Sequence, residues 1–252
     1  MLVEFRVKNF KSIRDEQVLS MIASKDTSLE DTHVLKPDDV SIRSLKSAAI
    51  YGPNAGGKSN LLQALYFMRW SLINRRTPTT PFSDYEKQPF FKLDAKSRNS
   101  PSEFEMTYLD KGVRYQYGFS LLGERVIEEW LLVYISDKPQ EWFRRTIDEN
   151  TGGDEYKFSS YFKGQKLTWQ KSTRKDALFL AVAAELNSEQ LKPVYQWLMK
   201  LDILNKSLLS RVTIYPHVFE NERDKKNLLD FLIAADLGIS DVELKKEENE
   251  YI

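Results

Sequence analysis

One run of eight residues carries the pattern best suited to chemistry. Gly52-Pro53-Asn54-Ala55-Gly56-Gly57-Lys58-Ser59 matches G-x-x-x-x-G-K-[ST]. Glycines let the backbone N–H groups of a loop converge on phosphate oxygens, and the N-terminal end of a following helix adds further donors. Lys58 would reach the β- and γ-phosphates, and Ser59 would offer its hydroxyl to Mg²⁺. The spacing therefore predicts a nucleotide-binding loop.

The segments on either side of this loop have the patterns that such a loop requires. Residues 48–51, Ala-Ala-Ile-Tyr, form a short apolar run without alternation, as expected of a buried parallel strand that Gly52 ends. After Lys58 the apolar residues recur at helical spacing, at Leu61, Leu65, Met68 and Leu72. The sequence thus predicts a strand, a phosphate loop and a helix of about four turns in succession.

The remainder of the chain alternates between two patterns. Residues 2–8 alternate polar and apolar side chains, which predicts a half-buried strand ending near Asn9 and Phe10. Residues 103–148 repeat this alternation several times with turn residues between, which predicts an antiparallel meander. Weaker strand patterns continue to Trp169. Residues 24–46 are predicted to form a loop or a short edge hairpin, and residues 74–102 an irregular surface segment. A further strand is predicted at residues 212–215. Helical spacing returns in residues 177–186 and 191–201.

The composition excludes several classes of protein. Of 252 residues, 41% are hydrophobic, which is enough for a substantial core, and the 37 basic residues balance the 37 acidic ones. Zero net charge means that any contact with nucleic acid must come from a local patch. The chain has no cysteine, which excludes disulfides, thiol catalysis and cysteine-ligated metals. No segment approaches the roughly 18 apolar residues of a membrane span, and the N-terminus is too charged for a signal peptide, so we expect a cytoplasmic protein without membrane contact.

Two segments together resemble a known family. Residues 7–13, V-K-N-F-K-S-I, and residues 49–62, A-I-Y-G-P-N-A-G-G-K-S-N-L-L, resemble the N-terminal half of ABC-type P-loop ATPases of the SMC/RecF/OLD group. Five later segments resemble a prokaryotic branch of stand-alone AAA/ABC ATPases, RloA-like, that is often encoded with defence or restriction genes: residues 91–94, 101–105, 114–119, 176–180 and 235–239.

This resemblance implies an α/β fold, a P-loop NTPase of ABC type with a mostly parallel core sheet, an antiparallel β-subdomain and an incomplete helical lobe. The corresponding domains would be residues 1–102, 103–170 and 171–252, the last continuing beyond this chain. The resemblance implies ATP and Mg²⁺ as cofactors and places Arg14 near the nucleotide. The residues expected to bind the cofactor are Lys11, Ser12, Gly52, Pro53, Asn54, Ala55, Gly56, Gly57, Lys58, Ser59 and Asn60, with Ser59 on the metal.

The sequence departs from the family pattern at the residues that would hydrolyse ATP. The glutamine that senses Mg²⁺ in such families is expected near residues 183–185, where the chain has Ala-Ala-Glu. The nearest apolar string before an acidic residue ends at Asp236, but Leu237 follows where a glutamate should stand, and we find no Ser-Gly-rich signature motif. The catalytic residues are therefore unassigned. The chain resembles the first half of a longer ATPase, or a truncated relative that binds nucleotide without hydrolysing it unaided.

The resemblance further suggests a function and partners. It favours an ATP-driven clamp in which two copies sandwich nucleotide and gate an effector protein such as a nuclease, in phage defence. One alternative is a nucleotide-gated scaffold that does not hydrolyse ATP. Another is an ATPase of DNA repair or maintenance.

Other chemically notable residues have simpler interpretations. His33 and His217 are too few and too far apart in the sequence to indicate a metal site or a catalytic triad. Glu128 and Glu129 are neighbours on a predicted strand, so they point to opposite faces, and we expect a solvated edge rather than an acid–base pair. Basic residues lie near aromatic ones, which leaves nucleic acid open as a partner, although strand amphipathicity explains the aromatics equally well: Arg75, Arg76, Trp142, Phe143, Arg144, Arg145, Trp169 and residues 171–175.

Overall fold

The computed structural model describes residues 1–37, 42–74, 90–136, 138–148, 150–201, 203, 221–234 and 241. The chain divides into two compact units, residues 1–203 and residues 204–252. In the second unit the described part is essentially one helix, α9 (Glu222–Ala234). The predicted strand at 212–215 and the residues His217 and Asp236 lie outside the described residues.

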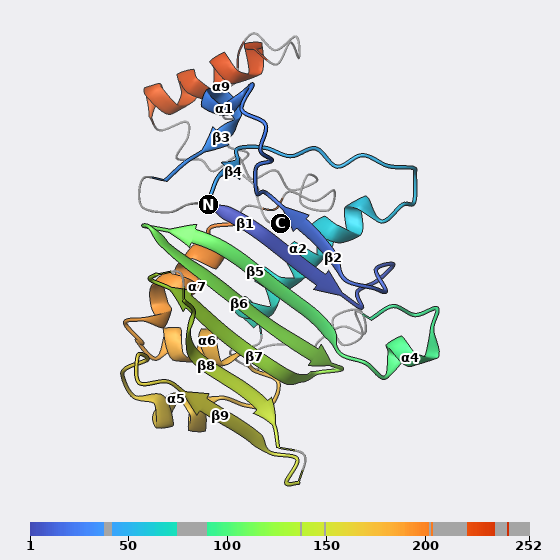
Figure 1. Cartoon of the computed structure of the whole chain (residues 1–252), viewed down its shortest axis with the longest axis vertical. Coiled ribbons are helices and arrows are strands. Elements are labelled where there is room, and N and C mark those ends of the chain that lie inside the picture. Colours follow the sequence, from blue (N-terminus) through green and yellow to red (C-terminus); the bar gives the residue numbers. More distant parts are fainter. Residues whose placement is uncertain are drawn as a thin grey trace, which may run out of the picture. The chain divides into compact units, whose positions relative to one another are not determined.

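A seven-stranded sheet forms the centre of the first unit (Figure 1). Its strands are β1 (Leu2–Lys8), β2 (Gln17–Ser20), β5 (Ser102–Asp110), β6 (Val113–Leu122), β7 (Arg125–Tyr134), β8 (Gln140–Ile147) and β9 (Asp154–Phe158). They lie in the order β2-β1-β5-β6-β7-β8-β9, and every pair is antiparallel. The predicted meander is therefore confirmed. The described strands contain no parallel pair, so the expected parallel core is not observed among them.

The first strand joins the meander directly. In β1 the apolar side chains of Val3, Phe5 and Val7 are all at most 2% exposed, whereas the side chains between them are half-buried or exposed, which confirms the predicted alternation. β1 pairs with β5 from Leu2↔Tyr108 to Lys8↔Glu103. The domain boundary predicted after residue 102 would thus separate β1 from nearly all of β5, although these two strands are hydrogen-bonded to each other.

Helices cover one face of the sheet and form a common core with it (Figure 1). They are α2 (Lys58–Asn74), α5 (Lys166–Ser172), α6 (Phe179–Glu185) and α7 (Leu191–Met199). The helix predicted after the phosphate loop is confirmed as α2, whose residues Leu65, Met68 and Leu72 are buried. The helical patterns of 177–186 and 191–201 are confirmed as α6 and α7. Phe104 of the sheet packs against Phe67 of α2, with their ring centroids 5.2 Å apart.

Shorter elements flank the sheet. Within residues 24–46 the chain forms α1 (Glu30–His33) and a two-stranded pair of β3 (Val34–Leu35) with β4 (Ser44–Leu45), which agrees with the predicted edge hairpin. α4 (Ala95–Arg98) is capped by the carboxylate of Asp94.

The strand predicted at residues 48–51 is wrong. The structure has no strand there, and its side chains are exposed, Ile50 by 41% and Tyr51 by 89%. An apolar run becomes a buried strand only if neighbouring strands hydrogen-bond to it. The seven strands of the sheet pair with one another and leave residues 48–51 without a partner strand among the described residues.

Candidate functional site

The predicted phosphate loop lies between the exposed residues 48–51 and helix α2, and its backbone is tightly curled. Ala55 and Gly57 have positive φ angles of 62° and 86°. The N–H of Gly56 donates to the carbonyl of Pro53 at 3.1 Å. A Cβ at Gly57 would lie 3.2 Å from the hydroxyl of Ser12, in addition to the strain of a left-handed conformation. Gly57 is therefore required both by its conformation and by the close approach of Ser12.

Helix α2 begins immediately after this loop, at Lys58. The N–H groups of Asn60 and Leu61 donate to the carbonyl of Gly57, which closes the first turn. The side chain of Lys58 folds back over the loop, and its ammonium donates to the carbonyls of Gly52 at 2.8 Å and Pro53 at 2.7 Å. The first turn of a 17-residue helix thus places a cation, the exposed Ser59 and the positive end of the helix dipole at one end of the loop.

A tight turn after β1 brings two further predicted residues to the loop. Phe10 and Ile13 exchange two backbone hydrogen bonds of 2.7 Å, so that Lys11 and Ser12 stand at the tip of the turn. The hydroxyl of Ser12 accepts a hydrogen bond of 2.6 Å from the side-chain amide of Asn60 in α2.

Lys11 contacts α2 one turn further along the helix. Its ammonium donates to the side-chain carbonyl of Gln63. Partial burial lowers the pKa of Lys11. The resemblance predicts Lys11 and Ser12 beside the nucleotide, and the structure brings this turn against the phosphate loop and the first turns of α2.

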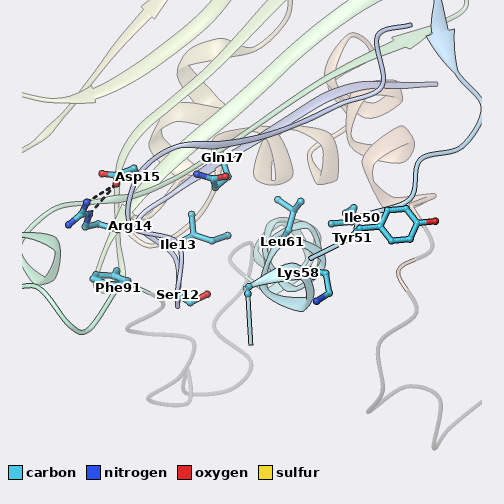
Figure 2. A pocket seen from close by; sticks show the side chains of 12 residues that line it. Ser12, Ile13, Arg14, Asp15, Gln17, Ile50, Tyr51, Lys58, Leu61 and Phe91 are labelled. Atoms are coloured by element: carbon cyan, nitrogen blue, oxygen red, sulfur yellow. Dashed lines mark hydrogen bonds and ion pairs between the residues drawn. The ribbon is translucent and has the colours of Figure 1, made fainter. Parts of the chain in front are cut away.

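An open pocket of about 550 Å³ lies between the turn and the loop (Figure 2). Its lining residues are Ser12, Ile13, Arg14, Asp15, Gln17, Ile50, Tyr51, Gly56, Gly57, Lys58, Leu61 and Phe91. Figure 2 shows Arg14, Asp15 and Phe91 on one side of the pocket, and Lys58 and Tyr51 on the other. This volume is in the range of small-ligand sites.

The predicted binding residues do not all line this pocket. Ser12, Gly56, Gly57 and Lys58 do, as does Arg14. The others stand at the tip of the turn, in the loop or on the first turn of α2, next to the lining residues: Lys11, Gly52, Pro53, Asn54, Ala55, Ser59 and Asn60.

The polar groups around this pocket suit a triphosphate with a bound magnesium ion. They do not suit a metal ion held by protein side chains alone. Within the described ranges, no three His, Cys, Asp or Glu side chains are grouped to hold a metal ion. Mg²⁺ at nucleotide sites commonly takes one or two protein oxygens and completes its shell with water and phosphate. The exposed hydroxyl of Ser59 can provide such an oxygen, while Lys58 and the loop N–H groups provide the donors that phosphate needs.

The positions considered for the missing catalytic groups do not reach this pocket in the described residues. Ala183 and Ala184 are buried within α6, and Glu185 is exposed at the end of that helix. None of the three lines the pocket. His33 is exposed and contacts the hydroxyl of its neighbour Thr32.

The environment of Glu129 differs from the solvated edge that its sequence predicts. Glu128 and Glu129 do point to opposite faces, but Glu129 does not belong to a solvated edge, because it is fully buried. Its carboxylate accepts hydrogen bonds from the N–H groups of Phe179 at 2.7 Å and Leu180 at 2.9 Å, and from the hydroxyl of Tyr117 at 3.0 Å. These donors come from the start of α6 and from β6. The residues next to Glu129 in the sequence give no sign of them, so its burial could not be predicted.

A buried arginine accompanies Glu129. The guanidinium of Arg145 lies 3.9 Å from that carboxylate and forms an ion pair of 2.8 Å with Asp154. It also donates to the carbonyls of Ala177 at 2.7 Å and Arg174 at 3.0 Å. This network fastens α6 and the segment before it to the sheet.

The aromatic residues considered for nucleic-acid contact are part of the core. Trp142 is 7% exposed, Trp169 is 4% exposed and Phe143 is fully buried, so none offers a free face for base stacking. Arg144 is paired with Glu128 and Glu141. Strand amphipathicity is therefore the correct explanation for Trp142 and Phe143 of β8, whereas Trp169 is buried in helix α5, where the sequence predicts a weak strand. Arg75 and Arg76 lie outside the described residues.

The loop, its helix and the turn that abuts them define the class of the protein, a P-loop nucleotide-binding protein. Residues 47–208, more than half of the chain, match the family described as "AAA domain, putative AbiEii toxin, Type IV TA system". The chain belongs to this family, and a P-loop ATPase domain of this type generally binds ATP with Mg²⁺. No curated protein matches the chain. Among the helices that the structure describes, none combines the length and apolar character of a membrane span.

Proposed function

We propose that this chain binds Mg-ATP at Gly52–Ser59 as the nucleotide-binding part of an ABC/SMC-like ATPase. The observation that carries the proposal is the junction of loop and helix. Left-handed Gly57 is followed directly by Lys58 and Ser59 on the first turn of α2, and the family match includes this motif. The turn that carries Ser12 is held against the start of α2 by the hydrogen bond from Asn60 to the Ser12 hydroxyl.

On binding, Lys58 would exchange its two carbonyl partners for phosphate oxygens. Its ammonium already lies over the loop, held at the carbonyls of Gly52 and Pro53. A triphosphate offers charged acceptors in place of these neutral ones, and charge-assisted hydrogen bonds are the stronger kind. The N–H groups at the start of α2 would donate to the same phosphates, favoured by the positive end of the helix dipole.

Ser59 would hold the magnesium ion together with the phosphates. When bound, Mg²⁺ neutralises phosphate charge and fixes the geometry of the β- and γ-phosphates. The hydroxyl of Ser59 is exposed on the first turn of α2, one residue from Lys58. Lys58 would thus contact the phosphates directly, and Ser59, the next residue, would act on them through the magnesium ion.

Binding and hydrolysis should separate in this chain. Phosphoryl transfer needs a group that orients the attacking water, whereas the proposed residues only hold phosphate and metal. We expect residues 1–252 to bind Mg-ATP with negligible steady-state hydrolysis. A phosphate-release assay with Lys58→Ala as the contamination control tests this expectation. Turnover near the enzyme median of about 10 s⁻¹ that disappears in the variant would contradict it, and Asp236 and Glu185 would then be the first residues to replace.

The wider function that we propose is an ATP-driven dimer clamp that gates an effector, such as a nuclease, in phage defence. Both the clamp and the defence role come from the resemblance to the SMC/RecF/OLD group and its RloA-like branch, whereas the family description names only a putative toxin of a type IV toxin–antitoxin system. The proposal includes the finer fold, a P-loop NTPase of ABC type with a mostly parallel core sheet. Light scattering with Mg-ATP and with Mg-ADP tests the clamp, which predicts a dimer with ATP alone.

Two alternatives differ in measurable ways. A nucleotide-gated scaffold would dimerise with Mg-ATP but would show no turnover even with its effector present. An ATPase of DNA repair or maintenance would bind DNA in a nucleotide-dependent way, and its neighbouring genes would belong to repair rather than defence.

A further inference from the structure

Asn9 occupies an unusual position at the end of β1. Its side chain is 3% exposed, and its backbone has a left-handed φ of 53°. Asparagine is one of the few residues with a side chain that adopts this conformation readily. Asn9 lies just before the turn that carries Lys11 and Ser12 to the phosphate loop.

The side-chain amide of Asn9 uses all of its hydrogen-bonding groups on one distant segment. Its NH₂ donates to the carbonyls of Ser97 at 2.8 Å, Ser100 at 2.9 Å and Pro101 at 3.3 Å. Its carbonyl accepts the N–H of Phe91 at 2.9 Å. One buried side chain therefore holds both ends of residues 91–101.

The backbone of Asn9 fixes the turn in the same way. Its N–H donates to the carbonyl of Arg14 at 3.1 Å, and its carbonyl accepts the hydroxyl of Ser102 at 2.6 Å. Arg14 and Phe91 both line the pocket beside the phosphate loop. Figure 2 shows these two residues together, on the side of the pocket opposite Lys58. Asn9 itself does not line this pocket but connects the two segments that form that wall.

We propose that Asn9 is a positioning residue, which holds Arg14 and Phe91 as the wall against which the nucleoside half of the bound nucleotide lies. The inference rests on the proposed function, because it needs the triphosphate half at Gly52–Ser59. The phosphate loop and Lys58 make no hydrogen bond to Asn9 among the described residues. Loss of Asn9 should therefore weaken nucleotide binding while leaving phosphate binding nearly intact.

The test compares Mg-ATP with Mg-tripolyphosphate, which carries the phosphates without the nucleoside. Asn9→Gly keeps the left-handed backbone accessible and removes the four side-chain hydrogen bonds. Asn187→Gly is the matched control, because Asn187 also has a left-handed φ of 60° and does not line the pocket. Calorimetry at a temperature at which all three proteins are folded gives the affinities.

We expect Asn9→Gly to bind Mg-ATP about tenfold more weakly than the wild type, with tripolyphosphate affinity within about twofold. Asn187→Gly should match the wild type with both ligands. Unchanged Mg-ATP affinity in folded Asn9→Gly overturns the inference, and so does an equal loss with both ligands, which indicates a general structural role. If the wild type binds neither ligand, the proposed function itself fails, and the inference fails with it.

If Asn9→Gly does not fold, Asn9→Asp serves instead. It keeps the acceptor for Phe91 and the side-chain size but places a carboxylate oxygen against the carbonyls of Ser97 and Ser100. The same pattern is expected, a loss with Mg-ATP that exceeds the loss with tripolyphosphate. Equal affinities for wild type and variant overturn the inference here too.

Discussion

Glu129 and Glu128 allow a direct comparison of a fully buried and a half-buried, solvent-accessible carboxylate on the same strand. Replacing Glu129 by alanine removes the acceptor for two backbone N–H groups and for the hydroxyl of Tyr117. These donors would stay buried without a partner, and Arg145 would lose one of its two carboxylates. Removing one partner of a buried ion pair lowers the free energy of unfolding by about 3–5 kcal/mol.

The cost at Glu129 should lie at the lower end of this range, about 3 kcal/mol, because Arg145 keeps Asp154 at 2.8 Å. For a domain of this size that corresponds to a fall in melting temperature of roughly 6–12 °C. Glu128→Ala is the control, since its partner Arg144 also pairs with Glu141 at the surface. Ion pairs that remain accessible to solvent contribute about 0–1 kcal/mol.

The assay is thermal and urea unfolding of the three proteins at pH 7. We expect Glu129→Ala to unfold well below the wild type and Glu128→Ala to unfold close to it. Equal melting temperatures for the two variants would refute the reasoning, because they would show that the network of Glu129 and Arg145 does not fasten α6 to the sheet.

Two further predictions concern the loop and the buried carboxyl. Gly57→Val should abolish the rise in melting temperature with Mg-ATP, because a β-branched side chain at φ 86° would press on Ser12; a wild-type rise in the variant would place the phosphate site elsewhere. Burial raises the pKa of Glu129 above its ordinary 4.5, against the opposing effects of Arg145 and the N–H donors. The folded protein then holds this proton more tightly than the unfolded chain, so its contribution to the free energy of unfolding falls as pH rises from about 4.5 through the folded-state pKa. The melting temperature of the wild type minus that of Glu129→Gln should therefore decrease between pH 4.5 and 7, and a rising difference would contradict the sign.

Local patterns predict much of this fold. Alternation in β1 and in residues 103–148 gives the strands, because one face of an antiparallel sheet is buried and the other is not. Helical spacing gives α2, and the glycine–lysine–serine pattern gives the loop before it. In each case the signal lies within one element or between neighbouring elements of the sequence.

Features that depend on distant partners could not be predicted. Residues 48–51 have the composition of a buried strand, but their burial depends on strands elsewhere in the sequence. Glu129 resembles any surface glutamate until the N–H groups of Phe179 and Leu180, fifty residues away, are placed beside it. Asn9 is similar, because only the fold brings residues 91–101 to its amide.

In the proposed function, Lys58 and its loop bind the phosphates of Mg-ATP. Isothermal titration calorimetry of Mg-ATP into wild-type protein and into Lys58→Ala tests it directly, with circular dichroism to show that the variant is folded. We expect measurable binding by the wild type and a loss of about 1.5–3 kcal/mol in the variant, or roughly 10- to 150-fold in affinity, because one charge-assisted contact is removed. Equal Mg-ATP affinity in the folded variant, or no binding by the wild type, would overturn the proposed nucleotide site.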